Sequence, residues 1–508
     1  MLTKSQQDRL DRISTPFSKW CNATKNVRTE PLRTFSPENK EDVLWIIQDA
    51  REKGITVRPV GAGHSFSEAA REDYYLISPL ALDQVQKYEK AIRPNSLPDQ
   101  KHLVRVQAGI RIKSLNPALY DMGYALDNMG AFDWQTISGA ISTGTHGTGI
   151  HRPAIHDMVR SVIIILSNGE TLQIESSQGI TDPVQFGHDG GIKLVQDDDL
   201  FYSVMVSLGN MGFIYEYVLE VSDAFWLAET RKVMTWDDEL KPLILSGEFE
   251  KEWIQKFEFV SFRINPYYTI NKTTGKKERL CVVSKQWIHD DKRIPHGEAR
   301  NLFFTFLGNL GFTMWILVWR LNNKLSRIPE SINTAIKDSK DRRFVNRSYK
   351  LLYQSGLSIR REGISSEFAF DLNYHHLVEL LDKLGDHFAH LRDDYGLYLS
   401  SHLPVRFVPQ SKAYLSQCHT GSKMYIDVPT LDGVHGAEQV LDRNQKFVLD
   451  TLREYNGIIH WGKVNYHLYS RHDIIESHYP MLPVWKRVRE QLDPIGMFHS
   501  YFAKKMGL

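Results

Sequence analysis

The chain has 508 residues, of which 42% are hydrophobic and 24% are charged, a balance typical of a globular protein with two or three domains. Its formal net charge of +1 excludes a surface-wide field that would recruit nucleic acid or acidic partners, so any charge effect is local. The three distant cysteines, Cys21, Cys281 and Cys418, form neither a disulfide framework nor a CxxC pair for zinc or redox chemistry.

The amino-terminal segment predicts a helix that leads into a strand. Its first residues, MLTKSQQDRLDRIS, are polar and lack the apolar core of a secretory signal, so we expect a cytoplasmic protein in a reducing compartment. Residues 36–54 place Val43, Ile46 and Ala50 at helical spacing, with acidic residues in the first half and Gly54 as the stop. The β-branched residues that follow read as a strand.

This strand ends in VRPVGAGHSFS, residues 57–67, where a Gly-Ala-Gly turn is followed by His64. Such a turn brings main-chain N–H groups against a pyrophosphate and holds an imidazole near a reactive group, although a plain glycine turn is the alternative. A Rossmann site is excluded, because Phe66 stands at the third glycine position and the next residues leave no room for the required helix.

The same α+β unit continues to about residue 222. Residues 102–112 predict a strand and turn, and the short helix after them ends at Gly123. Two β runs between residues 159 and 174 are joined by Asn168-Gly169, which predicts a hairpin.

Two further glycine-rich corners lie in this unit. ISGAISTGTHGTG, residues 137–149, offers N–H groups and hydroxyls at close approach, which suits a phosphate or the edge of a flavin ring. A loop buried for packing is the alternative. SLGNMGFIYEYVLEV, residues 207–221, again runs a glycine turn into a β segment. Three such corners before residue 222 indicate one extended ligand.

From about residue 224 to 455 longer strands, such as residues 257–264, alternate with helices, which indicates a second α+β domain. Residues 374–391 carry leucines and a phenylalanine along one helical face. His387 and His390 on this helix have a spacing that metal ligands use, but no Glu or Cys partner is evident, so we expect a solvated face and no metal. A Ser-His-Asp hydrolase is excluded because GxSxG is absent.

Residues 301–319, NLFFTFLGNLGFTMWILVW, contain no charge and are about long enough to cross a bilayer. A helix packed in or on the protein is one interpretation, and peripheral membrane contact, aided by Trp315, Trp319 and the basic RLNNKLSR after them, is another. A single crossing is disfavoured, because it would place the two halves of one shared fold on opposite sides of the membrane. The basic side chains of residues 331–361 form a solvated face or meet anionic lipid.

Five stretches together resemble the flavin-linked sugar-acid lactone and alditol oxidases, most closely those acting on L-gulonolactone and D-arabinono-1,4-lactone. They are VRPVGAGHSFS, VQAGIRIKSLNPALYDMGYALDNMG, ISGAISTGTHGTG, HWGK at residues 460–463 and DPIGMFHSYF at residues 493–502. The likeness covers most of residues 20–222 and about 455–508 and is weak between them. It implies an α+β fold of the vanillyl-alcohol-oxidase (PCMH) type, with an FAD domain at 1–223, a substrate domain at 224–455 and a returning segment at 456–508.

The resemblance also implies which residues hold FAD, with His64 bonded covalently to the 8α-methyl group of the flavin. Such a bond prevents cofactor loss and makes the flavin a better electron acceptor. A noncovalent site with a packed His64 is the alternative. The implied contacts are Pro59, Val60, Gly61, Ala62, Gly63, His64, Ser65, Phe66, Ser67, Gly130, Ser138, Gly139, Ser142, Gly144, Thr145, His146, Gly147, Ile214 near the adenosine and His499 beside the flavin.

On the substrate side, HWGK would place the Lys463 ammonium by the flavin or the substrate hydroxyl, where it stabilises negative charge; a surface lysine is the alternative. Many relatives have a Glu-x-Arg pair facing the flavin. The matching stretch, HLPVRFVPQ, keeps Arg406 but has Pro404 in place of the glutamate. Glu367 could supply that carboxylate, or it could be an edge-strand residue.

Three more residues are expected to line the substrate site: Tyr425, Asp427 and His460. The implied reaction oxidises a CH–OH group of a sugar lactone or polyol, with hydride transfer to flavin N5 and reoxidation by oxygen or another acceptor. Two alternatives remain: a membrane-associated enzyme acting on a lipid-linked sugar, and a flavin-binding protein without turnover, which the missing glutamate motivates.

Overall fold

The computed structural model describes residues 1–89, 92–93, 101–187, 191–290, 325–338, 343–353, 363–431 and 434–508. The uncharged segment 301–319 lies outside these ranges. No helix within the described ranges combines the length and the apolar character that crossing a bilayer requires.

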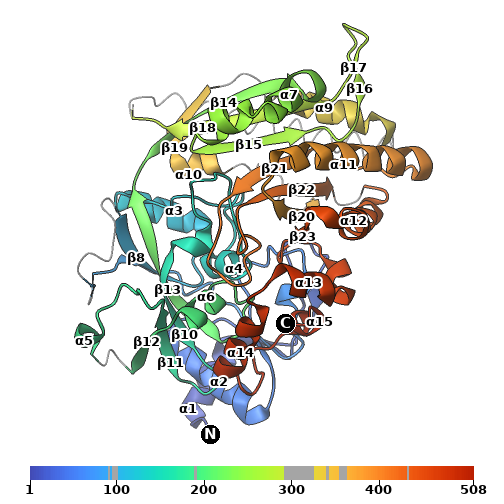
Figure 1. Cartoon of the computed structure of the whole chain (residues 1–508). Coiled ribbons are helices and arrows are strands. Elements are labelled where there is room, and N and C mark those ends of the chain that lie inside the picture. Colours follow the sequence, from blue (N-terminus) through green and yellow to red (C-terminus); the bar gives the residue numbers. More distant parts are fainter. Residues whose placement is uncertain are drawn as a thin grey trace.

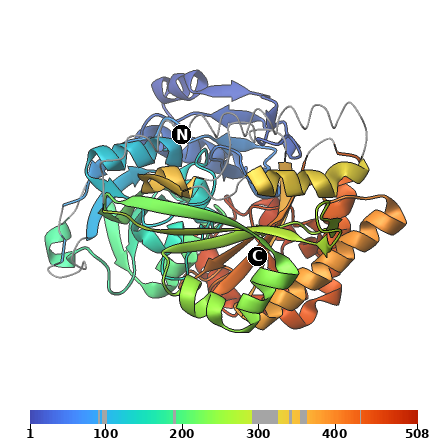
Figure 2. The same ribbon diagram turned by 90° about the horizontal axis from the view of Figure 1, so that it is seen from above.

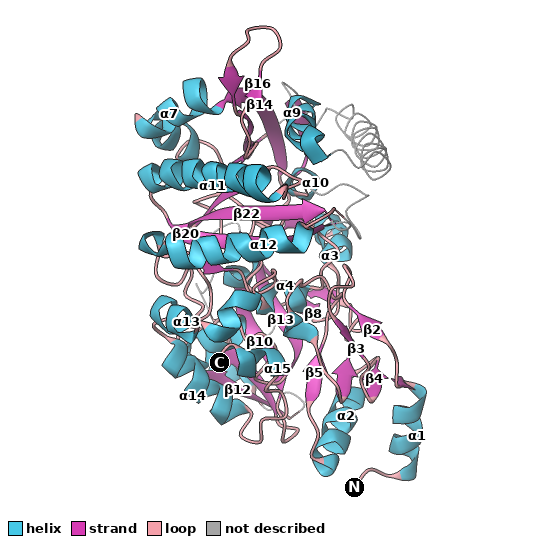
Figure 3. Ribbon diagram, turned by 90° about the vertical axis from the view of Figure 1, so that its right-hand side faces the viewer, coloured by secondary structure: helices cyan, strands magenta, loops and turns pink. Residues whose placement is uncertain are grey.

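A small four-stranded sheet with the order β1-β4-β6-β5 opens the chain, and helices α1 and α2 lie beside it at the bottom of Figure 3. Helix α2 confirms the helix predicted for residues 36–54: Asn39 caps its first turn and Gly54 ends it with a φ of +65°. The elements are α1 Lys4–Arg12, β1 Ser14–Pro16, β2 Trp20–Cys21, β3 Arg28–Thr29, β4 Arg33–Phe35, α2 Lys40–Lys53, β5 Val57–Pro59 and β6 Tyr75–Ile77.

A second, seven-stranded sheet has the order β12-β11-β10-β13-β8-β7, with β9 paired to β13. The predicted hairpin is confirmed, since β10 and β11 pair antiparallel and Gly169 takes a φ of +86° in the turn. The elements are β7 Val85–Lys87, β8 Lys101–Gln107, α3 Ile112–Asp121, β9 Tyr124–Ala125, α4 Ile137–Ser142, β10 Val159–Ile165, β11 Thr171–Glu175, α5 Pro183–Phe186, β12 Ile192–Gln196, α6 Asp198–Met205 and β13 Phe213–Asp223.

An eight-stranded sheet, here called the cap sheet, has the order β19-β14-β18-β15-β21-β22-β20-β23. Its elements and covering helices are β14 Trp226–Thr235, α7 Lys241–Leu245, β15 Phe259–Ile264, β18 Leu280–Ile288, α9 Ile328–Asp338, β19 Arg343–Arg347, α10 Ser348–Leu352, β20 Gly363–Asp371, α11 Tyr374–Tyr395, β21 Leu403–Val408, β22 Lys423–Leu431, α12 Ala437–Lys446 and β23 Ile458–Ile459. A short hairpin, β16 Thr269–Ile270 and β17 Lys277–Glu278, projects from it.

The cap sheet separates two environments. Helices α7, α9 and α11 lie beside it in the upper part of the molecule, and the amino-terminal half of the chain lies below it (Figure 1). Seen from above, its long green strands run across the middle of the molecule, over teal and red segments (Figure 2). Phe407 of β21 packs against Tyr374 of α11, with ring centroids 5.9 Å apart. Because side chains alternate along a strand, the neighbouring Arg406 points to the lower side.

The carboxyl-terminal segment connects the two halves. Its strand β23 pairs with β20 in the cap sheet, and the helices α13 His472–His478, α14 Leu482–Leu492 and α15 Tyr501–Lys505 then pack below (Figure 1). One buried apolar cluster runs from Val104 in β8 through Trp461 to Phe407 in the cap sheet. The boundaries at residues 223 and 455 remain predictions.

Candidate active site

Four charged side chains meet on the lower side of the cap sheet, and we call them the Glu367 cluster: Glu367, Arg406, Asp427 and Lys463. Sheet register explains three of them. Glu367 of β20 stands opposite Asp427 of β22, and Arg406 of β21 stands opposite Tyr425, two residues from Asp427 on the same face. Lys463 arrives from the segment that follows β23.

The ammonium of Lys463 is the centre of the cluster. Its Nζ donates to Ser365 Oγ at 2.8 Å and lies 3.3 Å from Asp427 Oδ1 and 3.5 Å from Glu367 Oε2. Arg406 Nη1 approaches Glu367 Oε1 at 3.4 Å. Lys463 therefore has charged partners within the site and is only partly exposed, which favours the predicted role over a surface lysine.

The environment shifts the pKa values of the two carboxyl groups in opposite directions. Burial raises the pKa of Asp427, and the negative charge of Glu367 raises it further against the pull of Lys463. Burial also disfavours ionised Glu367, but Lys463, His146 and Arg406 outweigh it and hold the pKa of Glu367 well below its usual range. The pKa of Lys463 is raised, because Asp427 and Glu367 outweigh the effect of burial. At neutral pH the cluster thus combines an ionised Glu367 with a charged Lys463.

Exposure shows which members a ligand can reach. The Lys463 and Arg406 side chains are 21% and 17% exposed, and Asp427 is 12% exposed. Glu367 is enclosed behind them at 4%. The edge-strand alternative for Glu367 is wrong, because β20 lies between β22 and β23.

The glycine-rich turn at residues 144–147 lies directly against this cluster. His146 Nε2 is 3.7 Å from Glu367 Oε2, and its ring lies over Tyr425 with centroids 3.7 Å apart. Further along the turn, Thr148 Oγ1 donates to the backbone carbonyl of Val260 in β15. The turn is therefore fixed between the cap sheet and the lower half.

His460 joins the same turn to the carboxyl-terminal segment. Its Nε2 lies 3.2 Å from the Gly144 carbonyl, and its Nδ1 accepts a bond from the Gly462 N–H at 3.0 Å. These partners place the proton on Nε2 and use both ring nitrogens. Burial lowers the pKa of His460 to about 3, so the ring stays neutral.

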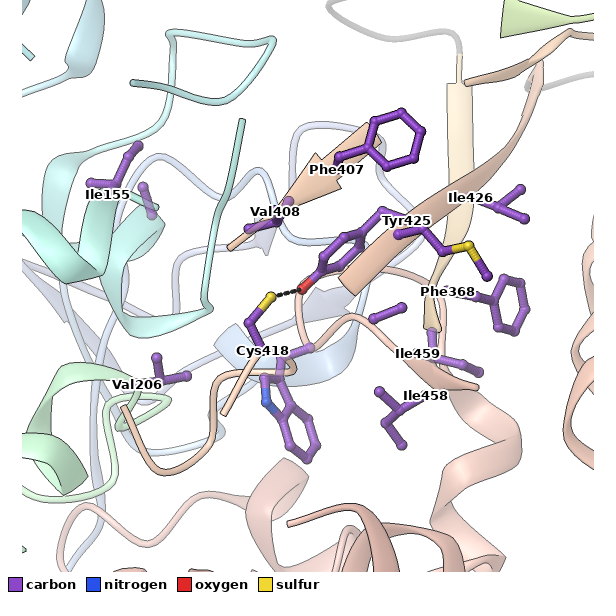
Figure 4. Packing of buried hydrophobic residues seen from close by; sticks show 14 of the residues in the cluster. Ile155, Val206, Phe368, Phe407, Val408, Cys418, Tyr425, Ile426, Ile458 and Ile459 are labelled. Atoms are coloured by element: carbon purple, nitrogen blue, oxygen red, sulfur yellow. Dashed lines mark hydrogen bonds between the residues drawn. The ribbon is translucent and has the colours of Figure 1, made fainter. Parts of the chain in front are cut away.

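Tyr425 and Cys418 lie at the apolar edge of the site, with Val408 beside the Tyr425 ring (Figure 4). Tyr425 Oη and Cys418 Sγ are 3.4 Å apart. Burial raises the pKa of Cys418 to about 12 and that of Tyr425 well above its usual value. Neither group ionises at neutral pH, and Tyr425 provides a ring surface rather than a charge.

The stretch at residues 59–67 reaches the cluster from the opposite side. Phe66 N–H donates to the Gly462 carbonyl at 2.7 Å, Ser67 Oγ donates to the Trp461 carbonyl at 2.7 Å, and Lys463 Nζ lies 5.6 Å from the Phe66 ring centre. The glycine turn, HWGK and the cap sheet thus converge, although the sequence separates them by up to 400 residues. His64 makes an edge contact with Phe132 at 4.7 Å.

Glycines let the backbones of these loops approach one another closely. A Cβ at Gly61 would lie 2.1 Å from Thr136 Oγ1, and one at Gly147 would lie 2.1 Å from Asn128 Oδ1. A Cβ at Gly130 would lie 2.9 Å from Thr145 Cγ2. Such packing leaves main-chain groups, rather than side chains, to line the loops.

Three of the predicted cofactor residues, Ile214, Ser142 and His499, lie away from the cluster. Ile214 is buried in β13 opposite Ile164, and the Ser142 carbonyl accepts the Leu208 N–H. His499 Nε2 lies 3.0 Å from the Leu508 carbonyl, beside the loop at residues 207–212. The structure does not bring His499 to Glu367.

The solvated face expected for His387 and His390 on α11 is confirmed for His390 and wrong for His387. His390 is exposed and pairs with Asp394, but His387 stacks on Phe447 with ring centroids 4.1 Å apart. Burial lowers the pKa of His387 to about 4. The leucine pattern identified the buried face, but it could not show that a neighbouring helix covers its border.

The comparisons with known proteins first define the class. The family described as FAD binding domain matches residues 31–175. A cholesterol oxidase from B. sterolicum has a TM-score of 0.70 at 13% identity, over 96% of each chain, and a solvent-stable cholesterol oxidase has 0.69 at 14%, over 96% of this chain and 97% of that one. The fold is the vanillyl-alcohol-oxidase type, and the protein is an FAD-dependent oxidoreductase.

The match to the second half of the chain shows the particular family. The family described as D-arabinono-1,4-lactone oxidase matches residues 219–506, more than half of the chain, and the chain belongs to it. L-gulono-1,4-lactone dehydrogenase of Mycobacterium tuberculosis is 22% identical over 96% of this chain and 98% of its own length. L-gulonolactone oxidase of Mus musculus is 24% identical over 96% and 98%. D-arabinono-1,4-lactone oxidase of Saccharomyces cerevisiae is 28% identical over 47% and 41%.

The residues present fit FAD. At Gly61, Gly130 and Gly147 neighbouring protein atoms leave no room for a side chain, so main-chain groups line this glycine cradle, which suits a pyrophosphate or a flat ring. A charged lysine stands beside it to balance negative charge. Sequence reasoning missed Ser365, which hydrogen-bonds Lys463; a serine in a β run carries no signal until the register is known.

Proposed function

We propose that the protein oxidises a CH–OH group of a sugar-derived 1,4-lactone, such as L-gulono-1,4-lactone or D-arabinono-1,4-lactone, at the Glu367 cluster. The single observation that carries this is the convergence of Lys463 with two buried carboxyl groups beside the turn at 144–147. The names of the relatives support the lactone class. Substrate hydroxyls suit this site, because a hydroxyl can donate a hydrogen bond to a carboxylate and accept one from a cation at the same time.

We assign different tasks to the two carboxyl groups. Asp427 has the raised pKa and the greater exposure, so it is the better proton acceptor for the substrate hydroxyl, through a carboxylate oxygen. Glu367 stays ionised and enclosed, and holds Lys463 and Arg406 in place. This modifies the sequence prediction, in which Glu367 supplied the missing catalytic carboxylate itself.

Lys463 and Arg406 orient the substrate oxygen and stabilise negative charge. Bound FAD supplies the two-electron acceptor for the hydrogen of the carbinol carbon. Tyr425 covers the apolar edge and excludes water. His460, whose two nitrogens are engaged, positions Gly144 and Gly462 rather than binding substrate.

The test is anaerobic reduction of the protein-bound flavin by each lactone. The loss of the visible absorbance of the flavin measures this reduction. We expect a 1,4-lactone to bleach the flavin and the corresponding open-chain aldonate, which lacks the ring, to act more slowly. If neither lactone bleaches a flavin that dithionite does reduce, the proposed reaction is wrong. Lipid-linked sugars and polyols belong in the same panel as competing substrates.

We further propose that His64 tethers the flavin covalently. Forming this bond replaces a ring N–H and a methyl C–H by one N–C bond, so two electrons and two protons leave to the electron acceptor. The position of His64 after the glycine turn and the family resemblance support this. Acid-precipitated protein should stay yellow, and His64→Ala should lose that colour; a colourless precipitate from the unmodified protein would contradict the tether and leave FAD binding intact.

The relatives' names include oxidases and a dehydrogenase, so oxygen and a soluble dye are the two acceptors to compare. We propose oxygen as the acceptor, on the weight of the oxidase names and the family description. Peroxide formation in step with lactone consumption would support this. Turnover with the dye alone would assign the protein to the dehydrogenases.

A further inference from the structure

Arg58 is a buried cation that the site described above does not use. It lies in β5, immediately before the stretch at residues 59–67, and is 4% exposed. Its Nη1 donates to the Gly209 carbonyl at 3.1 Å, and its Nη2 donates to the Leu208 carbonyl. Arg58 therefore joins the small amino-terminal sheet to the loop at residues 207–212.

The charge of Arg58 is poorly balanced by protein groups. Among the residues that the structure describes, no carboxylate hydrogen-bonds to it, and its Nε is buried without a partner. Burial lowers the pKa of Arg58 to about 10, and the field of Glu72 offsets only part of this. One oxygen of Glu72 is already bonded to Thr56 and to two backbone N–H groups. A buried cation in this state is costly unless an anion lies near it.

The loop that receives Arg58 is strained and firmly held. Leu208 has a φ of +51°, a conformation that leucine rarely adopts. Its N–H donates to the Ser142 carbonyl at 3.0 Å, and its carbonyl also accepts from Asn210 Nδ2 at 3.0 Å. A Cβ at Gly209 would lie 3.2 Å from Arg58 Nη1. The end of α4, the loop and β5 thus meet around this guanidinium.

We propose that Arg58 is a cofactor-binding residue whose buried positive charge attracts the pyrophosphate of FAD while its carbonyl contacts hold the loop at 207–212 against the stretch at 59–67. Both segments are glycine corners expected at the extended cofactor, and the pyrophosphate supplies the anion that the protein lacks at this point. The proposal rests on the FAD part of the proposed function and not on the substrate.

The test uses apoprotein carrying His64→Ala, so that ligands exchange freely, and compares ADP with adenosine as probes. Arg58→Met should weaken ADP and FAD binding about ten- to a hundredfold, the range for a lost bond to a charged group, and leave adenosine binding nearly unchanged. Arg58→Lys, which keeps the charge, should lose less affinity for ADP and FAD. Arg33→Met is the matched control, since Arg33 of the same sheet pairs with Asp11 on the surface.

Thermal unfolding of the apoprotein shows whether weaker ADP binding in Arg58→Met comes from the lost charge or from a destabilised fold. We expect Arg58→Met to unfold near the same temperature as its parent, because removal of an unbalanced buried charge offsets the loss of the bonds to the Gly209 and Leu208 carbonyls. Equal losses for ADP and adenosine, or unchanged ADP binding, would overturn the proposal. If the parent with His64 purifies with FAD and Arg58→Met retains as much flavin per chain as Arg33→Met, the inference fails while FAD binding stands.

Discussion

Asp427 carries the sharpest prediction at the residue scale. Its raised pKa means that the proton-accepting form appears as pH rises through a value above the ordinary aspartate value of about 3.9, so the rate of flavin reduction should rise there too. Asp427→Asn should lower this rate at least about a hundredfold and remove that limb of the pH profile. Asp386→Asn, on the exposed side of α11, is the control; an unchanged limb in Asp427→Asn would assign the proton to another group.

The sequence could supply the members of this site but not their arrangement. Lys463 and Arg406 stood in stretches with family likeness, whereas Glu367 was found only as a carboxylate in a β run. Their meeting depends on strand order, which places β21, β22 and β20 side by side although they are separated in the chain. Which carboxyl group is enclosed follows from packing, and no local pattern records it.

At the scale of elements, the glycine turn at 144–147 is predicted to tolerate no side chain at Gly147. A Cβ there would lie 2.1 Å from Asn128 Oδ1 and 2.5 Å from the Met129 carbonyl, and the backbone cannot give way as a flexible side chain can. Gly147→Ala should therefore lose flavin. Gly139→Ala, whose Cβ meets Thr136 Oγ1 at 3.0 Å, should lose much less. Flavin absorbance per chain measures both, and equal flavin contents would contradict the cradle.

Helix α11 gives a prediction about stability. Asn373 caps it by accepting from the His375 and His376 N–H groups, at 2.9 and 3.1 Å. Asn373→Ala should lower the free energy of unfolding by about 1 kcal/mol, and Asn373→Asp should restore most of it. Chemical denaturation measures the difference. A midpoint unchanged in Asn373→Ala would show that tertiary packing alone fixes this end.

The predicted elements succeeded where sequence signals were local. The helices at 36–54 and 374–391 had apolar periodicity, the first also had Gly54 as its stop, and the Asn168-Gly169 hairpin had its turn residues. The eight-stranded order of the cap sheet could not be predicted, because pairings such as Phe259–Ile264 with Leu403–Val408 join strands more than a hundred residues apart. Pairing between distant strands produces no periodic pattern in the sequence.

At the scale of the whole molecule, neutral buried histidines predict acid sensitivity. Burial lowers the pKa of His402, His460 and His478 to about 3 and that of His387 to about 4, whereas each titrates near 6.5 when unfolded. Below pH 6.5 the unfolded chain thus binds more protons than the folded chain, so stability falls as pH drops toward 4, by up to about 1.4 kcal/mol per pH unit for each histidine.

This sensitivity can be traced to one side chain. His387→Gln should make the fall in the free energy of unfolding between pH 6.5 and 4 shallower, because one of these protonations is removed. Chemical denaturation at a series of pH values measures the slope. A slope identical to that of the unmodified protein would show that His387 titrates alike in both states.

The protein, as we propose, oxidises a lactone where the cap sheet, the turn at 144–147 and HWGK converge. The most direct test is the rapid-mixing rate of anaerobic flavin reduction by L-gulono-1,4-lactone or D-arabinono-1,4-lactone, in the unmodified protein and in Lys463→Met. We predict reduction in the unmodified protein and a rate at least about a hundredfold lower in the variant, with both flavins still reduced by dithionite. Equal rates in the two proteins would contradict this proposal.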